Sequence, residues 1–274
     1  MHGGQRVGGE GGAMKSMLTI ACAALLLAGC SKSTDHAPSG DDAAVQATPV
    51  TKGDNQRPAY RATVLGLAAG SYGGTCNGIG GPMPPEGVTI GRDGRVVAAD
   101  WTINLAGTRL SLVRTLDGGA APAGTFDASG GERPFQLIVN SAGGGSAMFG
   151  EGGHVAQCTN VSSASNLAAK PLYPVVAHYF TGAGATLSCV EGGALRKTVV
   201  KPASAGVAFG EHQLGFDANV VQESISVEAD DSALQYGAKY ADRSHVELSV
   251  DAAGKLVMAT YTISSGVAVM CSPG

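Results

Sequence analysis

The sequence predicts an all-β protein, an antiparallel sandwich or a small barrel, built from two similar units that are each closed by a disulfide. Two observations support this fold class. From about residue 60 onward, short runs rich in β-branched and aromatic residues alternate with turns of Gly, Asp and Asn. In addition, the four cysteines of this region form two pairs with equal separations, one from Cys76 to Cys158 and one from Cys189 to Cys271.

Individual strands follow from alternation and turn chemistry. Val88–Ile103 is typical of two strands around an Asp-Gly turn, which is a strong hairpin signal. Arg109–Leu116 alternates with period two, and Phe135–Phe149 has the pattern of a second hairpin with a Gly-rich turn. Asn219–Ala229 and His245–Ile263 repeat these patterns. Because no segment shows a helical apolar face of three turns, we expect no helix.

The N-terminus carries the features of a secretion signal. Lys15 precedes an apolar run that ends at Ala28, which is shorter than the roughly 20 residues that a membrane-spanning helix needs. The Gly-rich residues 1–13 do not fit a signal peptide, so we predict that translation starts at Met14. The mature chain is then expected to lack residues 1–29, with the signal peptide itself beginning at Met14.

The end of this signal, Leu27-Ala28-Gly29-Cys30, resembles the lipobox of bacterial lipoproteins at all four positions. The resemblance implies that Cys30 becomes the first residue of the mature chain. It also implies a diacylglycerol thioether on the Cys30 sulfur and an acyl chain such as palmitate on its nitrogen, which together anchor the chain stably in a membrane. Ser31 after the cysteine implies the outer membrane of a Gram-negative bacterium, with the body in the periplasm or at the cell surface.

The cysteines indicate how the body is closed. Of six cysteines, Cys22 belongs to the signal and Cys30 carries lipid. An even number remains in an exported chain, which predicts two disulfides with three possible connectivities. The equal separations favour one of them, with the pairs Cys76–Cys158 and Cys189–Cys271.

The mature chain divides into four segments. Residues 30–58 are polar and Pro-containing and predict a flexible, lipidated tether. We expect a first β unit at 59–161, a linker at 162–174 and a second β unit at 175–274. The cysteine spacing implies a repeat offset that places Cys76 on Cys189, whereas the best match of "GRVVAADWTI" with "GKLVMATYTI" implies a longer offset. The sequence leaves both offsets open.

Motifs for catalysis and cofactor binding do not emerge. The net charge is −4, which gives no support for nucleic-acid binding. Ser146 is followed by Ala and Met, so the G-x-S-x-G motif of serine hydrolases is incomplete. The Gly-rich segments do not match the dinucleotide-binding pattern. No metal-ligand spacing occurs among the four histidines of the folded region, which are His154, His178, His212 and His245. The sequence therefore predicts no catalytic residue, metal site or cofactor.

Candidate contact residues come from the aromatic and loop positions. Trp101 is the only tryptophan, and its place on an alternating strand favours a core role. Tyr72, between Ser71 and two glycines, is the candidate for an exposed aromatic contact, and Met83 in a Pro-rich loop is a second candidate.

The favoured function is a non-enzymatic binding or scaffolding module, tethered to the outer membrane by Cys30 and facing an envelope protein or glycan. Two alternatives remain. One is an envelope hydrolase that acts on cell wall or polysaccharide, and the other is an inhibitor of a secreted enzyme. A polar cleft with His and carboxylate together would favour the hydrolase.

Overall fold

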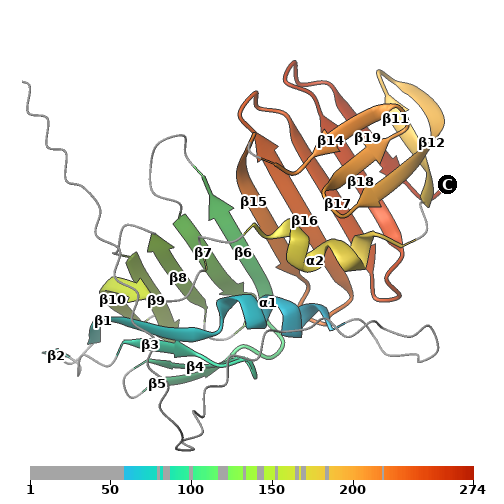
Figure 1. Cartoon of the computed structure of the whole chain (residues 1–274). Helices are drawn as coiled ribbons and strands as arrows, with labels where there is room; N and C mark the ends of the chain where they lie inside the picture. The colour runs from blue at the N-terminus through green and yellow to red at the C-terminus, as the bar shows by residue number, and fades with distance from the viewer. Residues whose placement is uncertain are drawn as a thin grey trace, which may run out of the picture. The chain divides into compact units, whose positions relative to one another are not determined.

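A computed structural model provides the structure of the chain (Figure 1). The structure describes residues 59–78, 81–82, 87–98, 101–116, 123–131, 134–140, 145–151, 154–163, 167, 171–182, 185–217 and 219–274. Within these ranges, the side chains of residues 75–82, 140, 151 and 154–163 are not described. The predictions for the signal peptide, Met14, Cys30, the tether and Met83 lie outside the described residues. Residues from Asp54 to the C-terminus belong to one compact unit.

The body is an antiparallel β structure, as predicted, with two short helices in addition. Its first half contains, in chain order, α1 (Tyr60–Ala68), β1 (Gly70–Gly78), β2 (Gly81–Pro82), β3 (Val88–Ile90), β4 (Arg95–Ala98), β5 (Trp101–Asn104), β6 (Arg109–Thr115), β7 (Ala123–Ser129), β8 (Phe135–Asn140), β9 (Gly145–Glu151) and β10 (His154–Ser163). The second half contains α2 (Tyr173–Phe180), β11 (Ala185–Glu191), β12 (Ala194–Ala203), β13 (Gly206–Phe209), β14 (His212–Gly215), β15 (Val220–Val227), β16 (Ala233–Tyr240), β17 (His245–Asp251), β18 (Leu256–Thr262) and β19 (Ala268–Ser272).

The two halves repeat the same arrangement of elements. Each begins with a helix, which is followed by a strand that carries a cysteine, and each ends with a second cysteine-bearing strand. The strand order is β5-β4-β3-β1-β10-β9-β8-β7-β6 in the first half and β14-β13-β12-β11-β19-β18-β17-β16-β15 in the second. Tyr60 and Tyr173 open the two helices, and the same offset that places Cys76 on Cys189 places Tyr60 on Tyr173. We call residues 60–163 the first repeat and residues 173–272 the second repeat.

A row of cross-strand pairs runs through both repeats and defines their equivalent residues. In the first repeat it is Leu112–Phe126–Leu137–Ala147–Cys158–Cys76. In the second repeat it is Ile225–Tyr236–Leu248–Ala259–Cys271–Cys189. The rows meet where β6 pairs with β15, because Leu112 pairs with Ile225, its own equivalent in the second repeat. The repeats are therefore related by a local two-fold axis through this pair, and the offset implied by the cysteines is the correct one.

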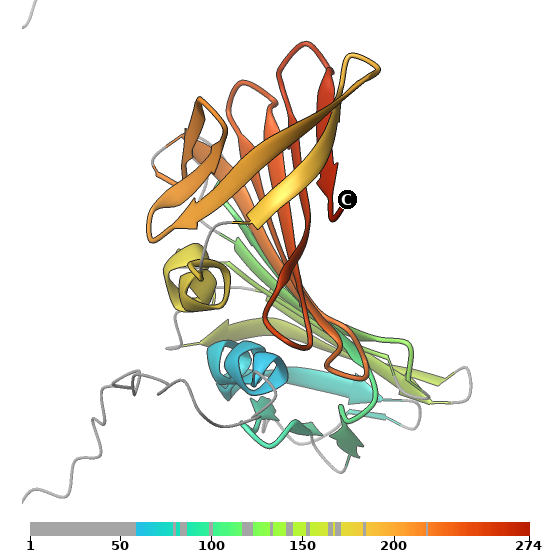
Figure 2. The ribbon, with the colours of Figure 1, turned by 90° about the vertical axis from the view of Figure 1, so that its right-hand side faces the viewer.

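Both helices cover one face of the strands. In Figures 1 and 2, α1 and α2 lie on the same side of the sheet. Helix α1 packs on β6 and β15, where the repeats join, and α2 packs on β12 and β17. The rings of Tyr60 and Tyr179 are 4.9 Å apart and link the two helices. The core is one continuous cluster that includes residues of both repeats, so the halves share a single core.

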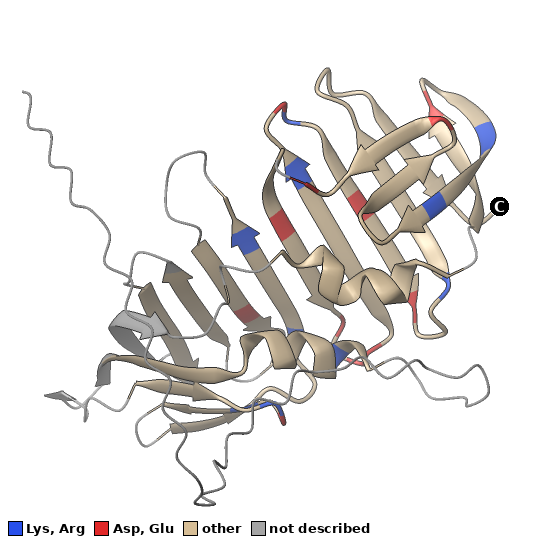
Figure 3. Cartoon of the chain, viewed as in Figure 1, with Lys and Arg blue, Asp and Glu red and all other residues tan. Residues whose placement is uncertain are grey.

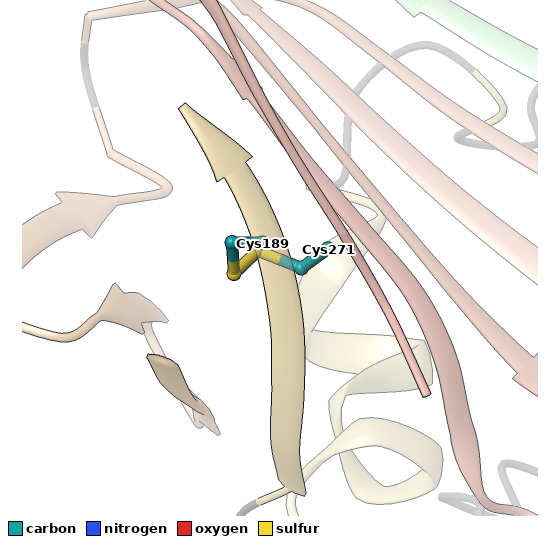
Figure 4. The surroundings of a disulfide bond; sticks show 2 residues. All are labelled: Cys189 and Cys271. Atoms are coloured by element: carbon teal, nitrogen blue, oxygen red, sulfur yellow. A yellow bond between two sulfur atoms is a disulfide. The ribbon is translucent and has the colours of Figure 1, made fainter. Parts of the chain in front are cut away.

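A disulfide joins β11 to β19 in the second repeat (Figure 4). It connects Cys189 and Cys271, which are direct partners across the two strands. This confirms the predicted pairing for these two cysteines. Cys76 and Cys158 are likewise direct partners across β1 and β10, and their disulfide stays a prediction because their side chains are not described. Each of these two strand pairs joins the start of a repeat to its end.

Three sequence predictions need correction. The expectation of no helix is wrong, since the buried residues of α2 recur at the helical spacing Tyr173, Val176, Ala177 and Phe180. The helices have 9 and 8 residues and fall below three turns. The second strand of the 88–103 hairpin is two strands, since Ala98 pairs with Trp101 across a further reversal. The expected linker also contains structure, since β10 extends to Ser163 and Tyr173 begins α2.

Candidate functional site

The junction between β6 and β15 has two faces of different character. Side chains alternate across each strand, so residues 110, 112 and 114 of β6 face the helices and residues 109, 111 and 113 face away. The same alternation places Glu223, Ile225 and Val227 of β15 on the helix side. The helix side is buried, whereas the other side is half-buried or exposed and is available to a ligand.

A buried polar cluster lies on the helix side of this junction. Arg114 Nη1 and Glu223 Oε2 form an ion pair at 2.9 Å, with side chains 10% and 3% exposed. The Glu223 carboxylate also accepts hydrogen bonds from the backbone N–H groups of Leu172 at 3.0 Å and Tyr173 at 3.1 Å. These two N–H groups form the N-terminus of α2, where a carboxylate complements the helix dipole. Tyr236 donates to Glu223 Oε1 at 3.1 Å.

This cluster positions α2 and offers little to a ligand. Burial, together with the Glu223 charge, raises the pKa of Tyr236 far above its ordinary value, so its hydroxyl stays protonated as a hydrogen-bond donor. The carboxylate of Glu223 is occupied by Arg114, Tyr236 and the two helix N–H groups. Since the Glu223 carboxylate is buried and its hydrogen bonds go to Arg114, Tyr236 and the N-terminus of α2, we assign the cluster a structural role.

On the opposite face of the same strands lies an open groove with a volume of 420 Å³. We call it the serine groove, and it is lined by Arg109, Ser111, Asp127, Ser129, Ser224, Ser226, Gln235, Tyr236, Gly237, Glu247, Leu248 and Met258. Tyr236 and Leu248 have buried side chains and line the groove with their backbone. Its centre lies beside the local two-fold axis, because Ser111 and Ser224 are equivalent residues of the two repeats.

A row of polar side chains crosses the groove perpendicular to the strands. We call it the polar row, and it consists of Gln136, Asp127, Ser111, Ser226 and Gln235 on β8, β7, β6, β15 and β16. Four strand spacings give it a length of about 19 Å. Hydrogen bonds order both ends, since Gln136 donates to Asp127 at 3.4 Å and Ser226 donates to Gln235 at 3.2 Å.

Few charged residues line the groove. Figure 3 shows that charged residues are sparse on the strands in general. Arg109 donates to Ser226 at 3.3 Å and to Gln235 at 3.4 Å, and its Nε lies 3.5 Å from Glu228. Asp127 and Glu247 add two carboxylates. Because Glu228 compensates Arg109, the lining has an excess of negative charge.

Gly237 keeps the floor of the groove open. It lies between Ser224 on β15 and Glu247 on β17. A Cβ atom added to Gly237 would lie 2.8 Å from Ser224 Oγ, so that hydroxyl would have to move. A glycine inside a strand is typical of places where a ligand or a backbone approaches closely.

The sequence-predicted residues lie elsewhere. Tyr72 was expected on the surface, but it is 1% exposed and its hydroxyl donates to the carbonyl of Ala68 at 2.5 Å. Its strand alternation turns it into the core, so the exposed contact is a wrong prediction. Trp101 is half-buried and packs against the core with an edge contact to Phe149 at 5.5 Å, so it borders the core and is not one of its buried residues.

The histidines stay apart in the part of the chain that the structure describes. His178, His212 and His245 lie on α2, β14 and β17, and the described residues contain no group of three or more potential metal ligands. Likewise, neither described helix is long and apolar enough to cross a membrane.

Sequence reasoning missed the groove. Three of its four serines, Ser111, Ser224 and Ser226, lie in the strands predicted at 109–116 and 219–229, at positions of the polar alternation. The fourth, Ser129, lies on β7, which the sequence analysis did not predict. That alternation identifies an outward face, but the pairing of β6 with β15 is what gathers the serines into one place.

In comparisons with known proteins, no protein-family model, curated protein or solved structure matches the chain.

Proposed function

We propose that the chain is a non-enzymatic binding module of the cell envelope, tethered to the outer membrane through Cys30, with the serine groove as its binding site. The groove carries this proposal, because it gathers hydroxyl, amide and charged groups from both repeats into one open concave site. Its 420 Å³ lie within the range of ligand sites, about 300–1,000 Å³.

The groove chemistry supports binding rather than catalysis. A serine nucleophile needs a general base within hydrogen-bond reach, and in the part of the chain that the structure describes no groove serine is hydrogen-bonded to a histidine, a lysine or a carboxylate. Glycoside hydrolysis needs two carboxyl groups at most about 9.5 Å apart. Asp127 on β7 and Glu247 on β17 are separated by four strand spacings, or about 19 Å.

The tether fits this role. The flexible tether predicted from the composition of residues 30–58 would have a mean reach of about 30 Å. A module on such a tether samples partners near the membrane at a high effective concentration, so a modest intrinsic affinity suffices for binding.

Photocrosslinking in cells tests the proposal. A photocrosslinking amino acid is placed at position 129, at the exposed rim of the groove, and in a matched control at position 195, where the side chain is 73% exposed but outside the groove. We expect one defined envelope component to crosslink at position 129 and not at position 195, and the adduct to be lost with Cys30→Ala. Equal labelling at both positions, or no adduct, would overturn the proposal.

A further inference from the structure

We infer that the ligand of the serine groove is a neutral glycan chain that lies along the polar row. This inference rests on the proposed function, since it names the chemistry that the same groove recognises. It follows from hydrogen-bonding capacity, from the geometry of a sheet face and from the charge of the lining.

Two of the serines that line the groove have uncommitted hydroxyl groups. Ser111 and Ser224, the two equivalent serines, make no side-chain hydrogen bond to any residue that the structure describes. Both are only partly exposed. A hydroxyl both donates and accepts, so these serines can match sugar hydroxyls, which have the same double capacity.

The flanking groups extend this match. Asp127 accepts hydrogen bonds only, whereas the Arg109 guanidinium donates only, and both point into the groove from neighbouring strands. The Gln235 amide does both. Gly237 and Met258 add a small apolar surface against which the C–H groups of a sugar ring can pack. A lining of this kind serves a ligand that is covered with hydroxyl and amide groups.

The position on a sheet face disfavours an extended peptide. Peptide recognition by sheets adds a strand at an edge, where backbone groups are unpaired. Here β6, β15 and β16 each pair on both sides, so their backbone groups are already used within the sheet. Recognition must therefore come from side chains that match functional groups along the ligand.

The charge selects among glycans. Asp127 and Glu247 repel uronic acids and phosphates, and Arg109 is partly neutralised by Glu228. Neutral sugars avoid this repulsion, so we expect affinity that is nearly independent of salt. The polar row is about 19 Å long, which favours an oligosaccharide over a single sugar.

Calorimetric titration of the purified full chain tests this inference. The probes are neutral N-acetylglucosamine oligomers of increasing length, the single sugar, and oligogalacturonate as the acidic counterpart. We expect affinity to rise with length to a plateau, and oligogalacturonate to bind at least tenfold more weakly. Ser111→Ala combined with Ser226→Ala should weaken binding about tenfold, whereas the control Ser272→Ala on β19 should leave it unchanged.

The outcomes separate the inference from the proposed function. If none of the neutral oligomers binds, or if the acidic oligomer binds better, the glycan inference is overturned. A protein adduct from the crosslinking at position 129 would then still uphold the binding module. If Ser111→Ala with Ser226→Ala binds the oligomers as tightly as the unchanged chain, glycan binding takes place outside the groove and the inference also fails.

Discussion

The two repeats share one backbone plan but differ in chemistry where they meet. Around the local two-fold axis, Glu223 of the second repeat is equivalent to Leu110 of the first, and Tyr236 is equivalent to Phe126. The first repeat thus has two apolar side chains, Leu110 and Phe126, at the positions where the second repeat has the carboxylate of Glu223 and the phenol of Tyr236. Across the junction, Leu110 pairs with Val227, whereas Glu223 pairs with Arg114.

Because of this difference, the N-termini of the two helices are bound by different carboxylates. The carboxylate of Glu223 receives the N-terminal N–H groups of α2 from within the second repeat. In the first repeat the equivalent residue is the apolar Leu110, and the Arg61 N–H of α1 instead donates at 3.1 Å to Asp231, in the turn after β15. The second repeat therefore supplies a carboxylate to both helices, and the first repeat depends on the second for its helix.

The largest effect is expected from the disulfides. Cys189→Ser with Cys271→Ser opens an 82-residue loop and should lower the free energy of unfolding by about 4–5 kcal/mol. If the repeats are equivalent, Cys76→Ser with Cys158→Ser has a similar effect. Urea unfolding of the oxidised proteins measures both. In the mature chain, which lacks Cys22 and has Cys30 lipidated, two free thiols after denaturation without reduction would contradict the predicted first-repeat disulfide.

A loss of stability nearly as large is expected when the Arg114–Glu223 ion pair is broken. Glu223→Ala removes the carboxylate from the buried ion pair with Arg114 and should reduce the free energy of unfolding by about 3–5 kcal/mol. The control is Arg114→Val with Glu223→Leu, which copies the equivalent Leu110–Val227 pair on the other side of the local two-fold axis. We expect this double variant to regain most of the loss and to lack only the helix cap, about 1 kcal/mol. A double variant as unstable as Glu223→Ala would contradict the equivalence of the two pairs.

Asp231 should show a smaller effect. Asp231→Gly removes the acceptor for α1 without straining a backbone that has φ 61°, and about 1–2 kcal/mol should be lost. Hydrogen exchange of the Arg61 amide should accelerate in this variant. Asp231→Asn keeps an acceptor and tolerates positive φ, so it should stay close to the parent. Unchanged exchange in Asp231→Gly would show that the contact does not hold α1.

The smallest losses of stability are expected from removing the hydroxyl groups of Tyr60 and Tyr173, the equivalent first residues of the two helices. The Tyr60 hydroxyl donates to the Asp251 carbonyl and the Tyr173 hydroxyl to the Ala203 carbonyl, each at 2.7 Å. Tyr60→Phe and Tyr173→Phe should each lower the free energy of unfolding by about 1 kcal/mol. Chemical unfolding at neutral pH measures this, and a loss in only one variant would show that the two hydroxyls are not equivalent.

The same tyrosines predict a dependence on alkaline pH. Burial raises the pKa of Tyr60 and of Tyr173 to about 12. The unfolded chain ionises near pH 10, so these groups contribute stability that is present below pH 10 and lost as the pH rises to about 12. Each Phe variant should lose less stability than the parent between pH 9 and pH 11. Equal losses in parent and variants would contradict this origin.

Local chemistry accounts for what could be predicted from the sequence. The hairpins at 88–98 and 245–263 follow from turn residues, and the equal cysteine spacing predicted the observed Cys189–Cys271 disulfide and the true repeat offset. Neither helix was predicted, because a helix of little more than two turns shows too few repeats of the apolar spacing to be recognised. The groove was not predicted because it depends on the pairing of β6 with β15, which no local pattern specifies.

The pairing of β6 with β15 also orders events during synthesis. Arg114 and Glu223 are 109 residues apart, so the first repeat is complete well before its partner strand has been made. Until then β6 is an open sheet edge, which is prone to aggregation. Proteins of this size accumulate such partly folded species. The edge of β6 therefore stays open to other strands until β15 is available to pair with it.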